Sequence, residues 1–79
     1  MNIHIEYCEK WNYYPEFERV SNIINQKYPK VIVNGNNNNP RTGSFEVTIN
    51  DKLVYSKFET NNFPNENEIL EWLNSSNLN

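Results

Sequence analysis

The sequence contains one cysteine, one histidine and two glycines among its 79 residues, and it has no long apolar run. A single cysteine cannot form a disulfide within the chain, which argues against a disulfide-stapled secreted domain and favours a reducing compartment, the cytoplasm. No apolar stretch is long enough to cross a bilayer. The first residues alternate apolar and polar side chains without a basic region, so we expect neither a signal peptide nor a membrane partner.

Charge and the scarce metal-binding residues exclude further classes of function. Seven Lys and Arg residues are spread singly along a chain of net charge -3, so no basic stripe predicts a nucleic-acid partner. His4 is the only histidine and lies on the face of its strand opposite Ile3 and Ile5, so we expect neither a metal site nor a Cys–His pair. Gly35 and Gly43 are too far apart to form a phosphate-cradling loop. We therefore expect no metal and no cofactor.

The apolar periodicity of the first half predicts a strand, a helix and a second strand. Residues 2–7 alternate apolar and polar side chains, as a strand does. A helix would start near Pro15 and stop at Pro29. Its apolar residues recur at spacings of three and four: Phe17, Val20, Ile24 and Tyr28. The β-branched run 31–33 predicts a strand buried on both faces and parallel to the first, because such a crossover is nearly always right-handed.

The second half predicts a hairpin and a closing helix. Residues 45–49 and 52–56 both alternate, and the link Asn50-Asp51 suits a tight turn. Asn65 can cap a helix together with Glu68. The expected order is β-α-β-β-β-α, an α/β sandwich in which two helices cover one face of a four-stranded mixed sheet. We assign residues 1–74 to this single domain and residues 75–79 to a frayed C-terminal tail.

Four segments, in this order, resemble the selenoprotein W family, also called the Rdx group of thioredoxin-like proteins. They are Glu6-Tyr7-Cys8, residues 40–47, residues 53–57 and Phe63-Pro64. The resemblance covers nearly the whole chain and implies a thioredoxin-like fold. It also implies cell redox chemistry, sometimes glutathione-linked, with glutathione as a co-substrate and thiol-containing proteins as partners. The end of the chain lacks the cysteine box of one prenylated branch of the family, so we expect no lipid anchor.

Carried over by position, the reactive pair of the family is Cys8 and Trp11, so an indole stands where members have a second cysteine or a selenocysteine. In a dithiol, one thiolate attacks the target and the other thiol releases the substrate from the mixed disulfide. An indole can do neither, and dithiol activity should be weakened. Whether the helix begins at the cysteine, where its dipole would favour a thiolate, or near Pro15 stays open at this stage.

The segment Arg41-Thr42-Gly43 is a candidate neighbour of the cysteine loop in the family match. Arg41 could offset the negative charge of Glu6 and Glu9 beside the cysteine, although a plain connecting role for Arg41 and Thr42 is an equal alternative. Gly43 precedes the hairpin, where we expect the backbone to pass close to the cysteine loop.

Three hypotheses for Cys8 and Trp11 remain open. Cys8 could act as a single-thiol oxidoreductase, with glutathione or a partner thiol resolving the mixed disulfide. The domain could instead be a redox-inactive binding module, with Trp11, Tyr13 and Tyr14 as an exposed aromatic patch. Trp11 could also cap the core above an inert Cys8. A separate hypothesis is that Trp11 stands for a UGA-encoded selenocysteine, and a UGG codon in the genome would end it.

Overall fold

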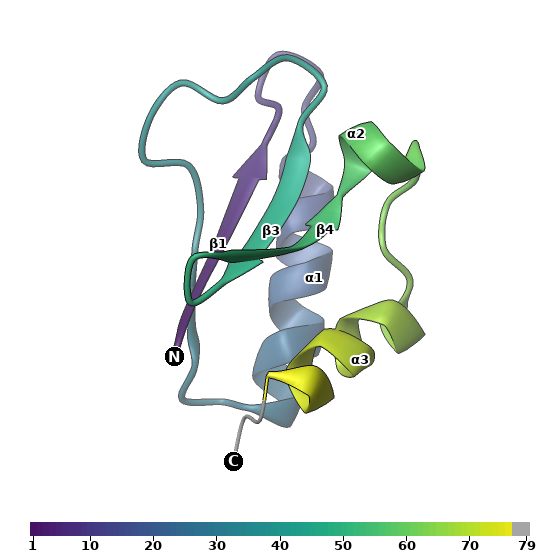
Figure 1. Ribbon diagram of the computed structural model, residues 1–79. Helices are drawn as coiled ribbons and strands as arrows, with labels where there is room; N and C mark the ends of the chain where they lie inside the picture. Colours follow the sequence, from purple (N-terminus) through teal and green to yellow (C-terminus); the bar gives the residue numbers. More distant parts are fainter. Residues whose placement is uncertain (77–79) are drawn as a thin grey trace.

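The computed structural model describes residues 1–76 and arranges helices against one face of a β-sheet (Figure 1). The elements in chain order are β1 (Asn2–Tyr7), α1 (Tyr14–Lys27), β2 (Ile32–Asn34), β3 (Phe45–Ile49), β4 (Lys52–Ser56), α2 (Lys57–Thr60) and α3 (Glu66–Ser75). The strand order is β2-β1-β3-β4, with β1 parallel to β2 and antiparallel to β3. The predicted four-stranded mixed sheet and its parallel crossover are therefore confirmed.

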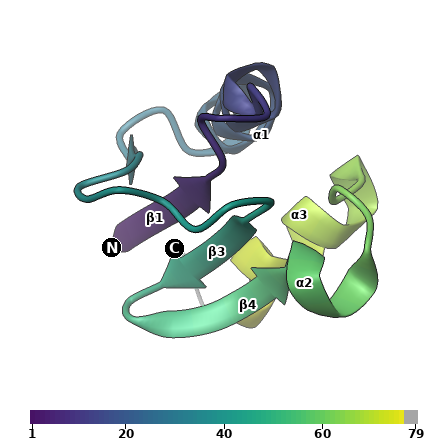
Figure 2. The same ribbon diagram turned by 90° about the horizontal axis from the view of Figure 1, so that it is seen from above.

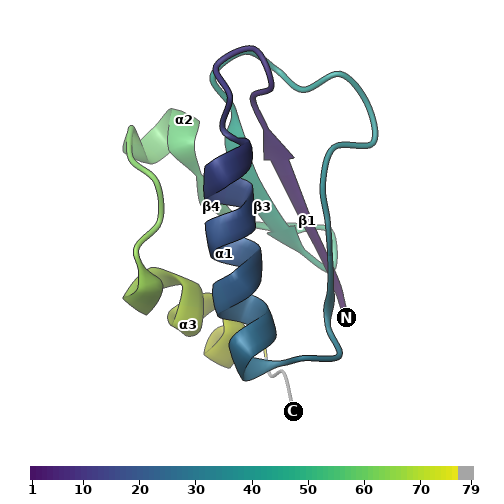
Figure 3. The same ribbon diagram turned by 180° about the vertical axis from the view of Figure 1, so that it is seen from behind.

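The core lies between the sheet and the helices α1 and α3. Ile3 and Ile5 point to this side of β1, and they are opposite Ile49 and Val47 of β3. Figure 3 shows α1 crossing in front of the sheet, while Figure 1 shows it behind the same strands. The remaining buried members are Val20, Ile24, Phe45, Tyr55, Ile69, Trp72 and Leu73. Each fully buried aliphatic side chain contributes about 1.5–3 kcal/mol relative to exposure.

The prediction that residues 31–33 form a strand buried on both faces is wrong. β2 is an edge strand, and the side chain of Ile32 is 71% exposed because none of the helices within residues 1–76 covers it on the outer face of the sheet. Where β2 ends, the Asn36 carboxamide takes over its pairing with β1. It accepts a hydrogen bond from the Tyr7 N–H at 3.0 Å and donates one to the Tyr7 carbonyl at 2.9 Å.

A third helix was not predicted. The short α2 follows β4 directly, and Figure 2 shows it beside the end of that strand. The carboxylate of Glu46 accepts the Lys57 N–H at 2.8 Å, and the Ser56 hydroxyl accepts the Glu59 N–H at 3.3 Å. Both contacts satisfy backbone donors that a helix start leaves unpaired.

The local turn and cap predictions are confirmed. Asn50 and Asp51 both have left-handed backbones, with φ of 51° and 67°, as the tight hairpin turn requires. Asn65 and Glu68 form a reciprocal capping box. Helix α3 continues through Ser75, the first residue of the predicted tail, and residues 77–79 lie outside the described part of the chain. Within residues 1–76 no helix is both long and apolar enough to span a bilayer.

Candidate thiol site

The cysteine loop joins β1 to α1 and is held at both of its ends. The Cys8 N–H donates to the Ser44 carbonyl at 2.9 Å, and the Cys8 carbonyl accepts the Tyr13 N–H at 2.9 Å. Within the loop, the Asn12 N–H donates to the Glu9 carbonyl at 3.0 Å. Figures 1 and 3 both show this loop beside the segment that enters β3. Cys8 is therefore fixed to the sheet on one side and to the start of α1 on the other.

The sulfur of Cys8 is buried and hydrogen-bonded. Its residue is 1% exposed, and the Sγ accepts the backbone N–H of Trp11 at 3.4 Å. Residues 8 and 11 thus have the close approach that a Cys-x-x-Cys pair needs. Helix α1 begins at Tyr14 with Pro15 in its first turn, which settles the question of where the helix starts. Because dipole effects fall off within the first turn, the Trp11 N–H is the donor available to a thiolate here.

The indole of Trp11 lies on the surface, against Gly43. A Cβ atom at position 43 would lie 2.9 Å from the indole Cζ3, and Gly43 has φ of +79°. The close approach expected at this glycine is therefore confirmed. Trp11 itself is 54% exposed, so it does not belong to the core. Its ring also meets the Tyr13 ring edge-on, with the centroids 6.1 Å apart.

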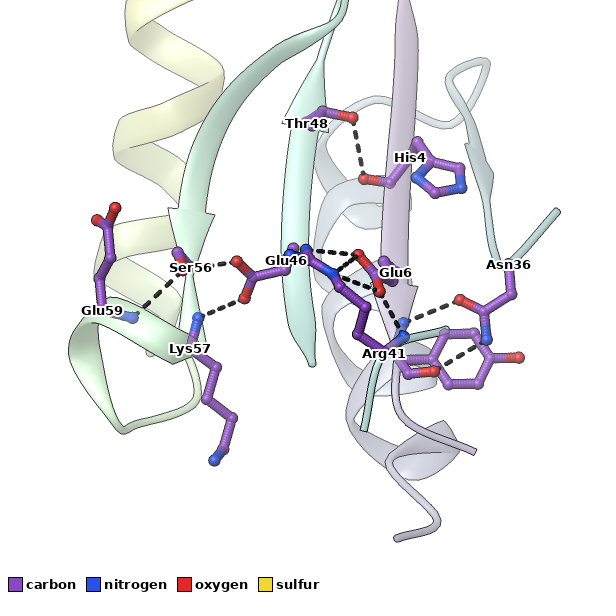
Figure 4. Close-up of polar contacts among 10 residues, drawn as sticks. His4, Glu6, Asn36, Arg41, Glu46, Thr48, Ser56, Lys57 and Glu59 are labelled. Atoms are coloured by element: carbon purple, nitrogen blue, oxygen red, sulfur yellow. Dashed lines mark hydrogen bonds and ion pairs between the residues drawn. The ribbon is translucent and has the colours of Figure 1, made fainter. Parts of the chain in front are cut away.

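Of the two alternatives left open for Arg41, the structure shows the one in which it pairs with Glu6 (Figure 4). Its Nη2 lies 2.8 Å from Glu6 Oε1, and its backbone N–H donates to Oε2 at 2.7 Å. These hydrogen bonds, led by the guanidinium, hold the pKa of Glu6 below its ordinary value of 4.5, although partial burial opposes the shift. The guanidinium also sits 5.0 Å from the centre of the Phe58 ring. Thr42 is exposed in the turn between Arg41 and Gly43.

A second carboxylate, Glu46, is buried on the outer face of the sheet and was missed by the sequence analysis (Figure 4). Besides its bond to the Lys57 N–H, it accepts the Ser56 hydroxyl at 2.6 Å. The alternation along β3 shows that Glu46 points away from the helices. It gives no signal of the neighbours that bury it, because these follow from the pairing of β3 with β4.

The outer face of the sheet also carries a groove of about 500 Å³ that does not include Cys8. The residues that line it are all of polar types: Asn2, His4, Glu6, Asn34, Asn36, Asn37, Asn38, Asn39, Thr48 and Asp51. The sequence placed His4 on this outer surface, and Figure 4 shows it there. In the part of the chain described, no cluster of three or more side chains of the metal-ligating types is found.

The aromatic patch differs from the predicted one. Trp11 and Tyr14 are exposed, but Tyr13 is half-buried and packs edge-on against Phe63 with ring centroids 4.8 Å apart. Phe58 from α2 is instead an exposed aromatic residue, at 47%. No sequence signal placed Phe58 near this end of the sheet, because α2 was not predicted.

A model of the Rdx family matches residues 2–75. This chain belongs to the Rdx family. Its curated relatives include Migration and invasion enhancer 1 of Bos taurus, 31% identical over 71 residues, a match that covers 90% of this chain and 60% of that protein. Selenoprotein W of Danio rerio is 31% identical over 58 residues, covering 72% of this chain and 67% of that protein. The chain thus spans only part of the length of these relatives.

Two solved structures share the fold. A selenoprotein W-related protein from Vibrio cholerae superposes with a TM-score of 0.80 at 21% identity, covering 94% of this chain and 92% of that one. A protein from Bordetella parapertussis gives a TM-score of 0.81 at 15% identity, covering 95% of each chain. These likenesses establish a thioredoxin-like fold of the selenoprotein W type.

Proposed function

We propose that this Rdx protein carries out single-thiol disulfide exchange at Cys8, with glutathione as co-substrate and thiol-containing proteins as partners. The cytoplasm is the compartment in which we expect it to act, since glutathione keeps thiols reduced there. Trp11 occupies the place of the resolving residue and weakens dithiol activity. The enzyme is then a glutathione-linked oxidoreductase with one protein sulfur.

The proposed exchange has two balanced steps. The Cys8 thiolate attacks one sulfur of a disulfide, a new bond forms to Cys8 Sγ, and the other half of the disulfide leaves as a thiolate. A second, external thiolate then attacks the mixed disulfide and releases the Cys8 thiolate. Across the two steps the external thiol supplies electrons and the substrate disulfide accepts them, so the exchange needs no metal or other cofactor.

One observation supports this proposal above the others. The Trp11 N–H lies 3.4 Å from Cys8 Sγ, so the loop retains the close approach of residues 8 and 11 while providing one sulfur. A donor in that position can stabilise negative charge on sulfur as exchange proceeds. Because residue 11 carries no thiol, release of the substrate must come from outside the chain.

A turnover assay tests the proposal. The purified protein should accelerate reduction of a small-molecule disulfide by glutathione, and the rate should rise with glutathione concentration because an external thiol completes the cycle. Cys8→Ser is the matched control, since it keeps the size of the side chain and removes the sulfur. A rate equal to that of Cys8→Ser would reject exchange at Cys8.

A redox-inactive binding module is the second candidate. It is favoured by three large aromatic side chains, Trp11, Tyr14 and Phe58, that stay between 47% and 54% exposed. Aromatic residues of this kind anchor many protein interfaces. In this case Cys8→Ser should capture the same partners from cell extract as the wild-type chain, whereas Trp11→Ala should lose them with its fold intact. Loss of capture in Cys8→Ser would favour thiol exchange instead.

A further inference from the structure

We infer that residues Glu9–Asn12 form a lid over the Cys8 thiol, fastened by the Trp11 indole on Gly43. The inference rests on the proposed thiol exchange and specifies how that site is regulated. In the closed state the sulfur is out of reach of a disulfide. In the open state it can be attacked, or can attack, from solvent.

The burial of Cys8 requires such a movement. The residue is 1% exposed, yet exchange needs a second sulfur to approach its Sγ directly. Cys8 is itself held to the sheet through the Ser44 carbonyl. We therefore expect residues 9–12 to move while Cys8 stays in place.

The lid segment has few ties to the rest of the molecule. All four of its residues are exposed, and its Asn12-to-Glu9 hydrogen bond is internal to the segment. The hydrogen bond from the Tyr13 N–H to the Cys8 carbonyl joins the two residues that flank the lid. This bond can therefore persist when residues 9–12 move away from the thiol. Segments with exposed backbone and few buried contacts open at much lower free energy than the core.

Trp11 fastens the lid through two contacts, in addition to its edge-on ring contact with Tyr13. Its N–H bonds to Cys8 Sγ at 3.4 Å, and sulfur is a weak acceptor. Its indole rests on Gly43, whose lack of a Cβ leaves the space that the ring fills. Gly43 adjoins Ser44, the residue bonded to Cys8, so the ring lies next to the backbone that holds the cysteine. Removing the indole or filling its seat should each release the lid.

Two variants remove the fastening, one by changing Trp11 and the other by changing Gly43. Trp11→Ala removes the ring. Gly43→Asn places a Cβ 2.9 Å from the indole Cζ3, too close for the ring to keep its present position, while asparagine tolerates the left-handed backbone found at +79°. Tyr14→Ala is the matched control, because Tyr14 is an exposed aromatic residue just outside the lid.

The measurement is the rate of alkylation of Cys8 by iodoacetamide in the native protein, divided by the rate in the unfolded chain. We expect both fastening variants to raise this ratio by about tenfold or more, since labelling follows the population of the open form. Tyr14→Ala should leave the ratio unchanged. Low urea should hardly affect the wild-type rate, because lid opening exposes little surface compared with unfolding.

Equal ratios in the wild type and both fastening variants would overturn the lid. So would a wild-type rate that rises with urea as steeply as global unfolding does, because Cys8 would then be reached only through the unfolded state. If Trp11→Ala fails to fold, Gly43→Asn and Trp11→Leu carry the same test.

Mixed-disulfide formation with glutathione disulfide is a second measurement, and it tests the lid and the proposed exchange chemistry separately. Faster alkylation in the fastening variants without any mixed disulfide after exposure to glutathione disulfide would leave the lid standing and reject the exchange chemistry. Mixed-disulfide formation at equal rates in the wild type and both fastening variants would support the exchange and reject the lid.

Discussion

Replacing Trp11 with cysteine should restore an intramolecular disulfide with Cys8. The backbone nitrogen of residue 11 lies 3.4 Å from Cys8 Sγ. Its Cα is about 1.5 Å further along the chain, so it lies at most about 5 Å from the sulfur. In a disulfide the S–S, S–Cβ and Cβ–Cα bonds together reach roughly 4–5 Å from one sulfur to the Cα of the partner residue, so a cysteine at position 11 would be within reach of Cys8 Sγ.

The size of the effect follows from the loop that the bond closes. For a loop from residue 8 to residue 11, the chain-entropy model gives a stabilisation of about 2 kcal/mol for the oxidised over the reduced variant. That difference corresponds to an increase in the urea midpoint of about 1–2 M for a small domain. The oxidised and the reduced Trp11→Cys variant both lack the indole, so the effect of its loss on stability cancels when the two are compared.

Alkylation trapping and mass spectrometry in glutathione redox buffers would measure the disulfide, and urea unfolding of each form would measure the gain. Trp11→Ser is the control for losing the indole without gaining a thiol. The reasoning is refuted if the two thiols stay reduced under oxidising conditions, or if oxidation lowers the urea midpoint. Either result would mean that residues 8 and 11 do not have the geometry of a redox pair.

Four substitutions test the electrostatics and the core by urea unfolding. Glu6→Gln should cost at most about 1 kcal/mol at neutral pH, because the Arg41 pair is partly exposed. Since the folded pKa of Glu6 is depressed below 4.5, this contribution is present above that value and is lost as the pH falls through the folded pKa, so the wild type and the variant should converge in acid. A constant difference would contradict this account. Glu46→Ala should cost about 1–3 kcal/mol by leaving two donors unpaired, whereas a neutral result would show that water replaces the carboxylate. Ile24→Ala should cost about 2–5 kcal/mol and Ile32→Ala almost nothing, and similar costs would contradict the assigned burial.

Elements governed by local chemistry were predictable from the sequence. The turn at Asn50-Asp51 and the Asn65 cap each depend on residues only a few positions apart in the chain, and both are present. The burial of Ile32 was mispredicted because it depends on which faces of the sheet the helices cover. Helix α2 has a local cap in Ser56, but it is only four residues long, and the second contact at its start comes from Glu46 of another strand, which the sequence does not reveal.

The candidate site also has one part that the sequence predicted and one part that it did not. The spacing of Cys8 and Trp11 within the family pattern placed the two residues together, and the structure shows that contact. The contacts that hold the loop in place could not be predicted, because they come from Ser44 and Gly43, which lie more than 30 residues further along the chain. Local patterns in the sequence contain no information on contacts between segments so far apart in the chain.

Intact-mass analysis of the native protein after exposure to glutathione disulfide tests the central claim most directly. A single sulfur in a site with the geometry of a pair predicts one glutathionyl adduct on Cys8, which persists after removal of glutathione disulfide and disappears only when an external thiol is added. The absence of an adduct in the native protein, alongside ready adduct formation in the unfolded chain, would contradict the claim.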